Sequence, residues 1–185
     1  QASAFMQRMY EAERGEQLKR LVYISSQAAA GPGQPDKPRT EDEQPAPISD
    51  YGQSKLSGEI AAKKYADKLP LTIVRPSAVF GPRDTDVFQF FQLAVAGWKV
   101  KFGGTETFVS VAFVRDVVAG IIAAAKSEQA IGETFFLNTE DVISFWAAQE
   151  MIADALKVET KPLRVPVVLL KALAQLDTAN AKKSG

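Results

Sequence analysis

Two short apolar runs with a helical stretch between them set the fold class of this chain. Residues 21–24, Leu-Val-Tyr-Ile, and residues 71–75, Leu-Thr-Ile-Val-Arg, are typical of strands buried on both faces of a parallel sheet. Between them, residues 50–68 alternate apolar and charged side chains with helical spacing. A strand, a helix and a strand in this order form a parallel crossover. The sequence therefore predicts an α/β protein built on a parallel sheet.

Further elements are expected along the rest of the chain. Helices are predicted over residues 3–14, about 87–96, about 115–126, about 144–156 and 166–176, and strands near residues 107–112 and 135–137. Residues 27–49 hold five prolines and a charged patch, which exclude a helix or a central strand, so we expect a long loop that partly covers a site. Residues 76–84 are expected to form a second loop, at the carboxyl end of a strand.

The composition removes several kinds of chemistry. The 185 residues include no cysteine and no histidine, so disulfides, thiol nucleophiles, histidine-based triads and the usual zinc or iron sites are excluded, and we expect no metal. The 22 basic and 22 acidic side chains balance, which gives no electrostatic footprint for nucleic acid. No apolar run approaches the length that a bilayer requires, and no signal peptide is evident at the start. We therefore expect a cytoplasmic protein with neither a nucleic-acid nor a membrane partner.

Tyr51 and Lys55 stand four positions apart in the helical stretch, so they share one face of the helix. A free phenol loses its proton near pH 10, too high for an acid or base at neutral pH. An ammonium about 5 Å away favours the phenolate by roughly 3 kcal/mol at an effective dielectric near 20. Tyr51 is therefore a candidate acid–base group for a substrate hydroxyl or carbonyl. Because this spacing also arises by chance, the pair by itself does not identify an enzyme.

Two serines, Ser25 and Ser26, end the first predicted strand. Ligands of open α/β sheets gather beyond the carboxyl ends of strands, where these hydroxyls would lie. For Ser25 we favour the interpretation that it merely ends the strand, whereas Ser26 is the better candidate for a ligand contact.

In this order and spacing, four segments resemble the extended short-chain dehydrogenase/reductase family, the group containing NAD(P)-dependent epimerases, dehydratases and reductases. They are residues 22–31, residues 50–59 (DYGQSKLSGE), residues 74–82 (VRPSAVFGP) and residues 114–118 (VRDVV). The resemblance implies a partial Rossmann-like doubly wound parallel sheet with a small C-terminal substrate-binding region. Residues 1–85 would form the C-terminal half of the Rossmann-like domain. Residues 86–185 would form a mixed substrate-binding region, to which about 114–138 add returning Rossmann elements.

The resemblance also implies roles for individual residues. Tyr51 matches the catalytic acid–base group, Lys55 the residue that favours the phenolate and holds the nicotinamide ribose, and Ser26 the hydroxyl that orients the reacting oxygen. The segment that matches the loop beside the nicotinamide consists of Pro76, Ser77, Ala78 and Val79. Asp116 matches an acidic position at the start of a helix. The implied chemistry is hydride transfer between NAD or NADP and a secondary alcohol or ketone of a small-molecule substrate.

The chain departs from the family pattern in two places. The glycine-rich turn that binds the dinucleotide pyrophosphate is not found in the sequence, so we expect a fragment that lacks the N-terminal dinucleotide-binding half. Sugar-nucleotide epimerases of the family often carry an Arg-Asp pair where this chain has Val109 and Ser110, and valine cannot replace a bidentate cation. This favours less charged ketones and alcohols as substrates, with Ser26, Gln27 and Arg83 as candidate substrate contacts.

Two questions stay open at this point. A noncatalytic nucleotide-sensing or interaction module on the same fold is the alternative to an enzyme, although the presence of Ser26, Tyr51 and Lys55 together argues against it. Family members often dimerise through two helices that here lie near residues 3–14 and 50–68, which makes a homodimer possible.

Overall fold

The chain divides into two compact units in the computed structural model, which describes residues 4, 7–8, 11, 18–34, 36–103, 106–139 and 141–166. The first unit comprises Gln1–Pro82 and Ser110–Val142, and the second comprises Arg83–Val109 and Ile143–Gly185. The chain therefore leaves the first unit at Pro82, returns to it at Ser110 and leaves it again after Val142.

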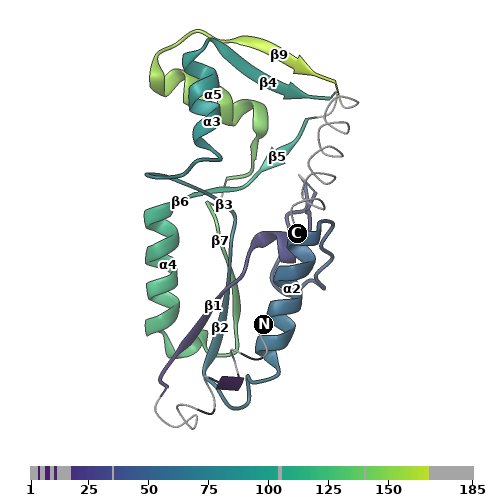
Figure 1. The fold of residues 1–185 in the computed structure, drawn as a ribbon, viewed down its shortest axis with the longest axis vertical. Coiled ribbons are helices and arrows are strands. Elements are labelled where there is room, and N and C mark those ends of the chain that lie inside the picture. The colour runs from purple at the N-terminus through teal and green to yellow at the C-terminus, as the bar shows by residue number, and fades with distance from the viewer. Residues whose placement is uncertain are drawn as a thin grey trace. The chain divides into compact units, whose positions relative to one another are not determined.

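The first unit is built on a three-stranded parallel sheet in the order β1-β2-β7, with β1 at Leu21–Ile24, β2 at Leu71–Pro76 and β7 at Thr134–Leu137. The central strand β2 is buried at all six of its residues, as its apolar run predicts. Helices α2 (Asp50–Lys63) and α4 (Val114–Lys126) lie on opposite sides of this sheet (Figure 1). The predicted parallel strands 21–24 and 71–75 with a helix between them are confirmed.

Helix α2 has clear signals at both ends. The Ser49 hydroxyl accepts a hydrogen bond of 3.1 Å from the Gly52 N–H, which makes Ser49 the N-cap. Asp50 in the first turn and Lys63 in the last turn both complement the helix dipole. The helix ends at Lys63, before the predicted end at residue 68, because residues 64–68 form turns that lead into the buried Leu69.

A small apolar core lies between α2 and the sheet. Its buried members are Ala62, Leu69, Leu71 and Ile73, each at most 3% exposed. The partly buried side chains packed against it are Leu18, Leu21, Tyr23 and Tyr65. This core joins α2 to strands β1 and β2 and so fixes the helix relative to the carboxyl ends of those strands.

Shorter elements in the first unit correct two sequence-based expectations. The predicted loop 27–49 begins with the 3-10 helix η1 at Gln27–Ala29, which Ser26 caps. The predicted loop 76–84 contains the short strand β3 at Ala78–Phe80, because these residues pair in parallel with β6 at Val111–Phe113. A further 3-10 helix, η2, occupies Glu128–Ala130.

The described residues of the second unit form two helices and two pairs of strands. They are α3 (Phe88–Val95), β4 (Trp98–Phe102), β5 (Phe108–Val109), β8 (Ile143–Ser144), α5 (Phe145–Leu156) and β9 (Lys161–Val165). Strand β4 pairs in parallel with β9, β5 pairs antiparallel with β8, and α3 packs on α5. Strands β4 and β9 were not predicted, because lysines interrupt the apolar run of β4, and Lys161, Pro162 and Arg164 interrupt that of β9.

The two terminal predictions fall mostly outside the described residues. Of the helix predicted over residues 3–14, the described Ala4, Gln7, Arg8 and Glu11 are helical. The helix predicted over residues 166–176 lies outside the described residues except for Pro166. Within the part of the chain that is described, no helix combines the length and the apolar character needed to cross a bilayer.

Candidate active site

Helix α2 presents Tyr51 and Lys55 as neighbours on one face. The Lys55 Nζ lies 5.7 Å from the centroid of the Tyr51 ring, a cation–π distance. Tyr51 is 57% exposed and Lys55 is half-buried, so a ligand can reach the phenol. The structure therefore brings together the pair that the sequence singled out.

Ser26 lies beside the start of α2. Its Oγ accepts a hydrogen bond of 3.2 Å from the Ala28 N–H, which leaves the hydroxyl proton available for a donation elsewhere. Helix η1, which Ser26 caps, packs against α2 so closely that a Cβ at Gly52 would lie 2.4 Å from the Ala28 carbonyl oxygen. Gly52 adjoins Tyr51 in sequence, so this close approach brings the Ser26 segment to the Tyr51 end of the helix.

Replacement of Gly52 with alanine tests this close approach. The added methyl group would meet backbone at Ala28, which cannot rotate away, so we expect a loss of about 1–3 kcal/mol in the free energy of unfolding. Ser57→Ala on the same helix, at an exposed position, serves as the control and should change stability by less than about 0.5 kcal/mol. Urea denaturation of both variants measures the difference, and equal stabilities would contradict the tight packing.

Residues 76–79 follow directly from the central strand. Pro76 is the last residue of β2, the Ser77 N–H donates to the Leu137 carbonyl at 3.1 Å, and the Ala78 N–H donates to the Ser110 carbonyl at 3.3 Å. The Ser77 Oγ is buried and has no hydrogen-bond partner among the described residues. Since β1 and β2 are parallel, with Ile24 opposite Val74, this segment leaves the sheet at the same edge as Ser25.

The two remaining predicted substrate contacts lie in different units. Gln27 is half-buried and follows Ser26 as the first residue of η1. Arg83 belongs to the second unit, is exposed, and has a left-handed backbone with φ of 73°. The carboxylate of the adjacent Asp84 accepts from the Phe88 N–H at the first residue of α3. The first unit thus gathers Ser26, Gln27, Tyr51, Lys55 and residues 76–79, without Arg83.

A buried polar cluster of Ser25, Glu59 and Arg75 was not predicted. Glu59 and Arg75 are 1% and 2% exposed and form a two-pronged ion pair, with Nε to Oε1 at 2.9 Å and Nη2 to Oε2 at 2.7 Å. The Ser25 hydroxyl donates to the same Oε1 at 2.5 Å. Ser25 therefore does more than end a strand, because its side chain is buried and hydrogen-bonded. One feature of the sequence could have indicated this cluster: Arg75 is a cation at the end of an otherwise apolar run, and the helix before that run carries Glu59.

Two aromatic residues border this cluster. The Arg75 guanidinium carbon lies 5.7 Å from the centroid of the Phe136 ring, and Phe136 is opposite Arg75 in the sheet. On the other side, the Tyr23 hydroxyl lies over Gly58, next to Glu59. Burial, and then the negative charge of Glu59, raise the pKa of Tyr23. The Glu59 carboxylate is therefore enclosed by Tyr23, Ser25 and the Arg75 guanidinium.

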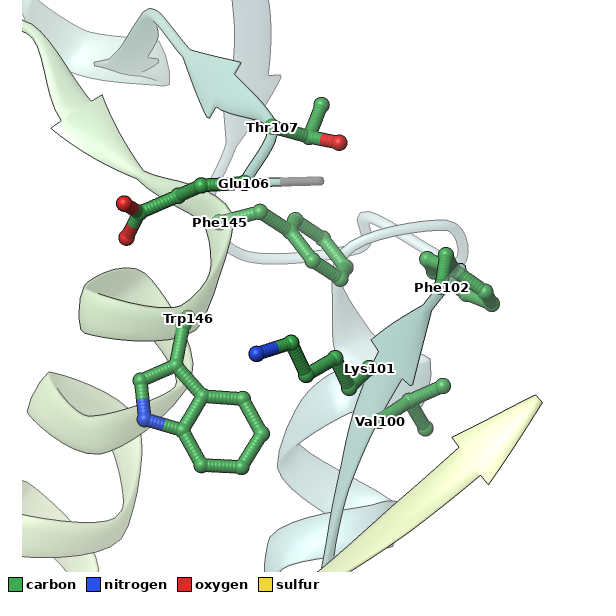
Figure 2. A pocket seen from close by; sticks show the side chains of 7 residues that line it. All are labelled: Val100, Lys101, Phe102, Glu106, Thr107, Phe145 and Trp146. Atoms are coloured by element: carbon green, nitrogen blue, oxygen red, sulfur yellow. The ribbon is translucent and has the colours of Figure 1, made fainter. Parts of the chain in front are cut away.

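The second unit contains a pocket of about 350 Å³. Its lining, shown in Figure 2, consists of Val100, Lys101, Phe102, Glu106, Thr107, Phe145 and Trp146. Phe145 stacks on Phe102 at 5.4 Å between ring centroids, so two of the lining rings support each other. Lys101 is the one cation among these seven lining residues.

Buried Gln149 fixes the wall of this pocket. Its side-chain amide accepts from the Val100 N–H at 2.7 Å and donates to the Val100 carbonyl at 2.9 Å, so it acts as a strand partner for β4. Lys99, on the same strand, lies 4.3 Å from the Trp146 ring centroid and 2.8 Å from Glu150 Oε1. The hydrogen bond from Lys99 lowers the pKa of Glu150, and this pair holds the Trp146 ring in place.

Comparison with solved structures shows the same fold in enzymes of nucleotide-sugar metabolism. UDP-glucuronic acid 4-epimerase from Bacillus cereus, in complex with UDP-glucuronic acid and NAD, is similar with a TM-score of 0.75 and 23% identity, over 89% of this chain and 54% of that chain. dTDP-glucose 4,6-dehydratase from Bacillus anthracis, in complex with NAD, is similar with a TM-score of 0.76 and 21% identity, over 89% of this chain and 54% of that chain. The fold is therefore Rossmann-like α/β.

Sequence comparison leads to the same group of proteins. The mouse sterol-4-alpha-carboxylate 3-dehydrogenase, decarboxylating, is 32% identical over 170 residues, which are 86% of this chain and 47% of that protein. The chain spans 31–48% of the length of the curated relatives that match at least 80% of it. The profile of the NAD-dependent epimerase/dehydratase family matches residues 2–137, nearly three-quarters of the chain. The chain therefore belongs to the NAD-dependent epimerase/dehydratase family, the extended short-chain dehydrogenases/reductases that segments 22–31, 50–59, 74–82 and 114–118 resemble.

Proposed function

We propose that this protein is an NAD-dependent oxidoreductase or epimerase that transfers hydride at a secondary alcohol or ketone of a small-molecule substrate. The observation that carries the proposal is the Lys55 ammonium beside an exposed Tyr51 phenol, on a helix whose start packs against the segment that follows Ser26. Two solved structures of similar fold are named as complexes with NAD, which supports NAD over NADP as the cofactor.

The residues of the first unit fit the nicotinamide end of NAD. The Lys55 ammonium and the Tyr51 hydroxyl can bind the two ribose hydroxyls. The buried Ser77 Oγ, which has no partner in the described part of the chain, offers a polar contact from segment 76–79. Bound NAD would supply the hydride acceptor or donor. Apolar side chains from residues 76–79 would exclude water beside it. The fit covers the nicotinamide end alone, because the chain holds no glycine-rich turn for a pyrophosphate.

The same residues can carry the proton that accompanies hydride transfer. Tyr51 would exchange its phenolic proton with the substrate oxygen, and such a positioned acid–base group contributes roughly 10²–10⁴-fold to the rate. Ser26 would donate its free hydroxyl proton to that oxygen and so fix its orientation. Lys55 would favour the phenolate by its charge.

We further propose that residues 86–185 supply most of the substrate-binding region. The three aromatic rings of the pocket support a substrate with a large apolar body, and Lys101, Glu106 and Thr107 would contact its polar groups. Val109 in place of an arginine points the same way, since no bidentate cation is available there for a diphosphate. Arg83 and Gln27 are proposed as additional polar contacts to the substrate.

A fluorescence titration with NADH tests the proposed cofactor site. The complete protein should bind NADH more tightly than NADPH, and Lys55→Met should weaken NADH binding by about 10–100-fold, because a charged hydrogen-bond donor is lost. Lys63→Met is the matched control, an exposed lysine in the last turn of the same helix, and should leave binding unchanged. Failure of the complete protein to bind NADH, or binding indifferent to Lys55, would argue against the proposal.

The proposal includes a cytoplasmic homodimer. Helix α2 exposes the apolar Ile60, which is 53% exposed, and just before the helix Ile48 is 81% exposed. Such side chains suit a contact between two copies of the helix near residues 50–68. Light scattering on the sample used for the titration gives the mass, and a monomer would reject this assembly.

A further inference from the structure

Lys55 lies between two side chains that could interact with its ammonium group. Tyr51 is four residues before it and Glu59 four residues after it on α2, so both lie one helical turn away. An opposite charge at this spacing normally forms an ion pair. Among the described residues, however, Lys55 forms no ion pair, and its Nζ lies beside the Tyr51 ring.

Hydrogen bonds to Arg75 and Ser25 keep the Glu59 carboxylate from pairing with Lys55. Oε1 accepts from Arg75 Nε and from the Ser25 hydroxyl, and Oε2 accepts from Arg75 Nη2. Glu59 is 1% exposed and turned toward strand β2, whereas Lys55 is half-buried. The two-pronged contact uses the planar fork of arginine, which fixes both carboxylate oxygens at once.

The cluster also adjoins every proposed catalytic segment. Ser25 precedes Ser26, Glu59 follows Lys55 by one turn on the same helix, and Arg75 precedes Pro76. The facing titratable group is Tyr23 of β1, and η1, which packs on α2, contributes no charged side chain. Arg75 is thus the single cation seen balancing Glu59 in the described structure.

We propose that Arg75 is a positioning residue for the Tyr51–Lys55 pair. Arg75 holds the Glu59 carboxylate against β2, so the Lys55 ammonium does not pair with Glu59 and stays beside the Tyr51 phenol. Arg75 acts through Glu59 and touches neither substrate nor cofactor. Loss of Arg75 frees a carboxylate one turn from Lys55, and the ammonium then moves from Tyr51 to Glu59. The catalytic importance of this positioning rests on the proposed function, whereas the placement of the Lys55 ammonium can be measured without any enzymatic activity.

Proton NMR of the 185-residue chain measures that placement. The ε-methylene protons of Lys55 should be displaced upfield by the Tyr51 ring, and Tyr51→Leu, which removes the ring, identifies the displaced signal. In Arg75→Met the displacement should fall by more than half. In the double variant Glu59→Gln/Arg75→Met it should return, because no carboxylate is left to attract the ammonium. Thr72→Val, which removes the buried hydrogen bond from Thr72 Oγ1 to the Ala130 carbonyl on the same strand, should leave the displacement at its parent value.

Two results would overturn the proposal: an unchanged displacement in folded Arg75→Met, or no recovery in the folded double variant. If Arg75→Met does not fold, Arg75→Lys is measured instead. Lysine keeps the positive charge but contacts only one carboxylate oxygen of Glu59, so the upfield displacement of the Lys55 protons should fall by a smaller amount. In the complete protein with NAD and substrate, kcat should fall at least tenfold in Arg75→Met and recover in the double variant. Absence of turnover in the parent would reject the proposed function and leave the NMR test of Arg75 unaffected.

Discussion

Tyr51→Phe should lower kcat for hydride transfer by roughly 10²–10⁴-fold in the complete protein, while the Kd for NADH rises by no more than about tenfold, the cost of one lost hydrogen bond to the ribose. Phenylalanine keeps the ring beside which the Lys55 ammonium lies and removes only the hydroxyl that exchanges the proton. Because Tyr51 is 57% exposed, the loss of its hydroxyl leaves no buried group unsatisfied and should not disturb the fold. Steady-state kinetics, with NADH binding measured by fluorescence, separates the two effects.

Tyr65→Phe is the matched control for this experiment. It makes the same chemical change just after helix α2, next to the apolar core and six residues beyond Glu59. We expect kcat to stay within about twofold of the parent value. Turnover that survives in Tyr51→Phe, or an equal loss in Tyr65→Phe, would remove Tyr51 from the proposed role.

The sequence was sufficient to predict the parts of the fold that rest on one kind of local signal. Residues 21–24 and 71–75 are continuous apolar runs, and such runs lie in a parallel sheet covered on both faces. The pair Tyr51 and Lys55 could be placed on one helix face because helical periodicity alone determines that relation. The family resemblance then supplied the proposed roles, which the geometry of α2 supports.

What the sequence did not reveal depends on contacts between distant segments. Strands β4 and β9 lie about 60 residues apart and contain lysines and a proline, so neither has an apolar pattern of its own. They form because each provides the other's hydrogen bonds and Gln149 completes those of Val100. Glu59 likewise resembles any exposed charge on α2 until the fold sets it against Arg75, 16 residues later. Long-range pairing of this kind leaves little trace in local periodicity.

The buried Glu59–Arg75 ion pair places two charged side chains inside the first unit. Taking a carboxylate and a guanidinium out of water costs several kcal/mol for each ion, which their attraction offsets only with good geometry and further hydrogen bonds. Glu59 meets this condition with three hydrogen bonds, whereas Arg75 leaves its Nη1 without a partner among the described residues. The pair is therefore a weak source of net stability, and its presence at this place suits the positioning role proposed for Arg75.

Removal of one member should nevertheless be costly. Arg75→Met removes the two-pronged partner of the buried Glu59 carboxylate, and one contact from Lys55 would offset only part of the loss, so we expect the free energy of unfolding at pH 7 to fall by about 3–5 kcal/mol. A protein of this kind has only about 5–15 kcal/mol in total, so the variant will be close to its folding limit. Thr72→Val removes one buried hydrogen bond on the same strand and should lower the free energy of unfolding by about 1–3 kcal/mol. It is the reference for the loss of a buried hydrogen bond without a buried charge.

The double variant Glu59→Gln/Arg75→Met should recover most of that loss and lie within about 2 kcal/mol of the parent, because both charges are gone and the glutamine oxygen still accepts from Ser25. Urea denaturation of the parent, the two single variants and the double variant gives the coupling energy as a cycle. A double variant as unstable as the sum of the single variants would mean that Glu59 and Arg75 stabilise the fold independently. A large favourable coupling would instead show that the cost lies in the unpaired charge, which is the same charge that would draw Lys55 away from Tyr51.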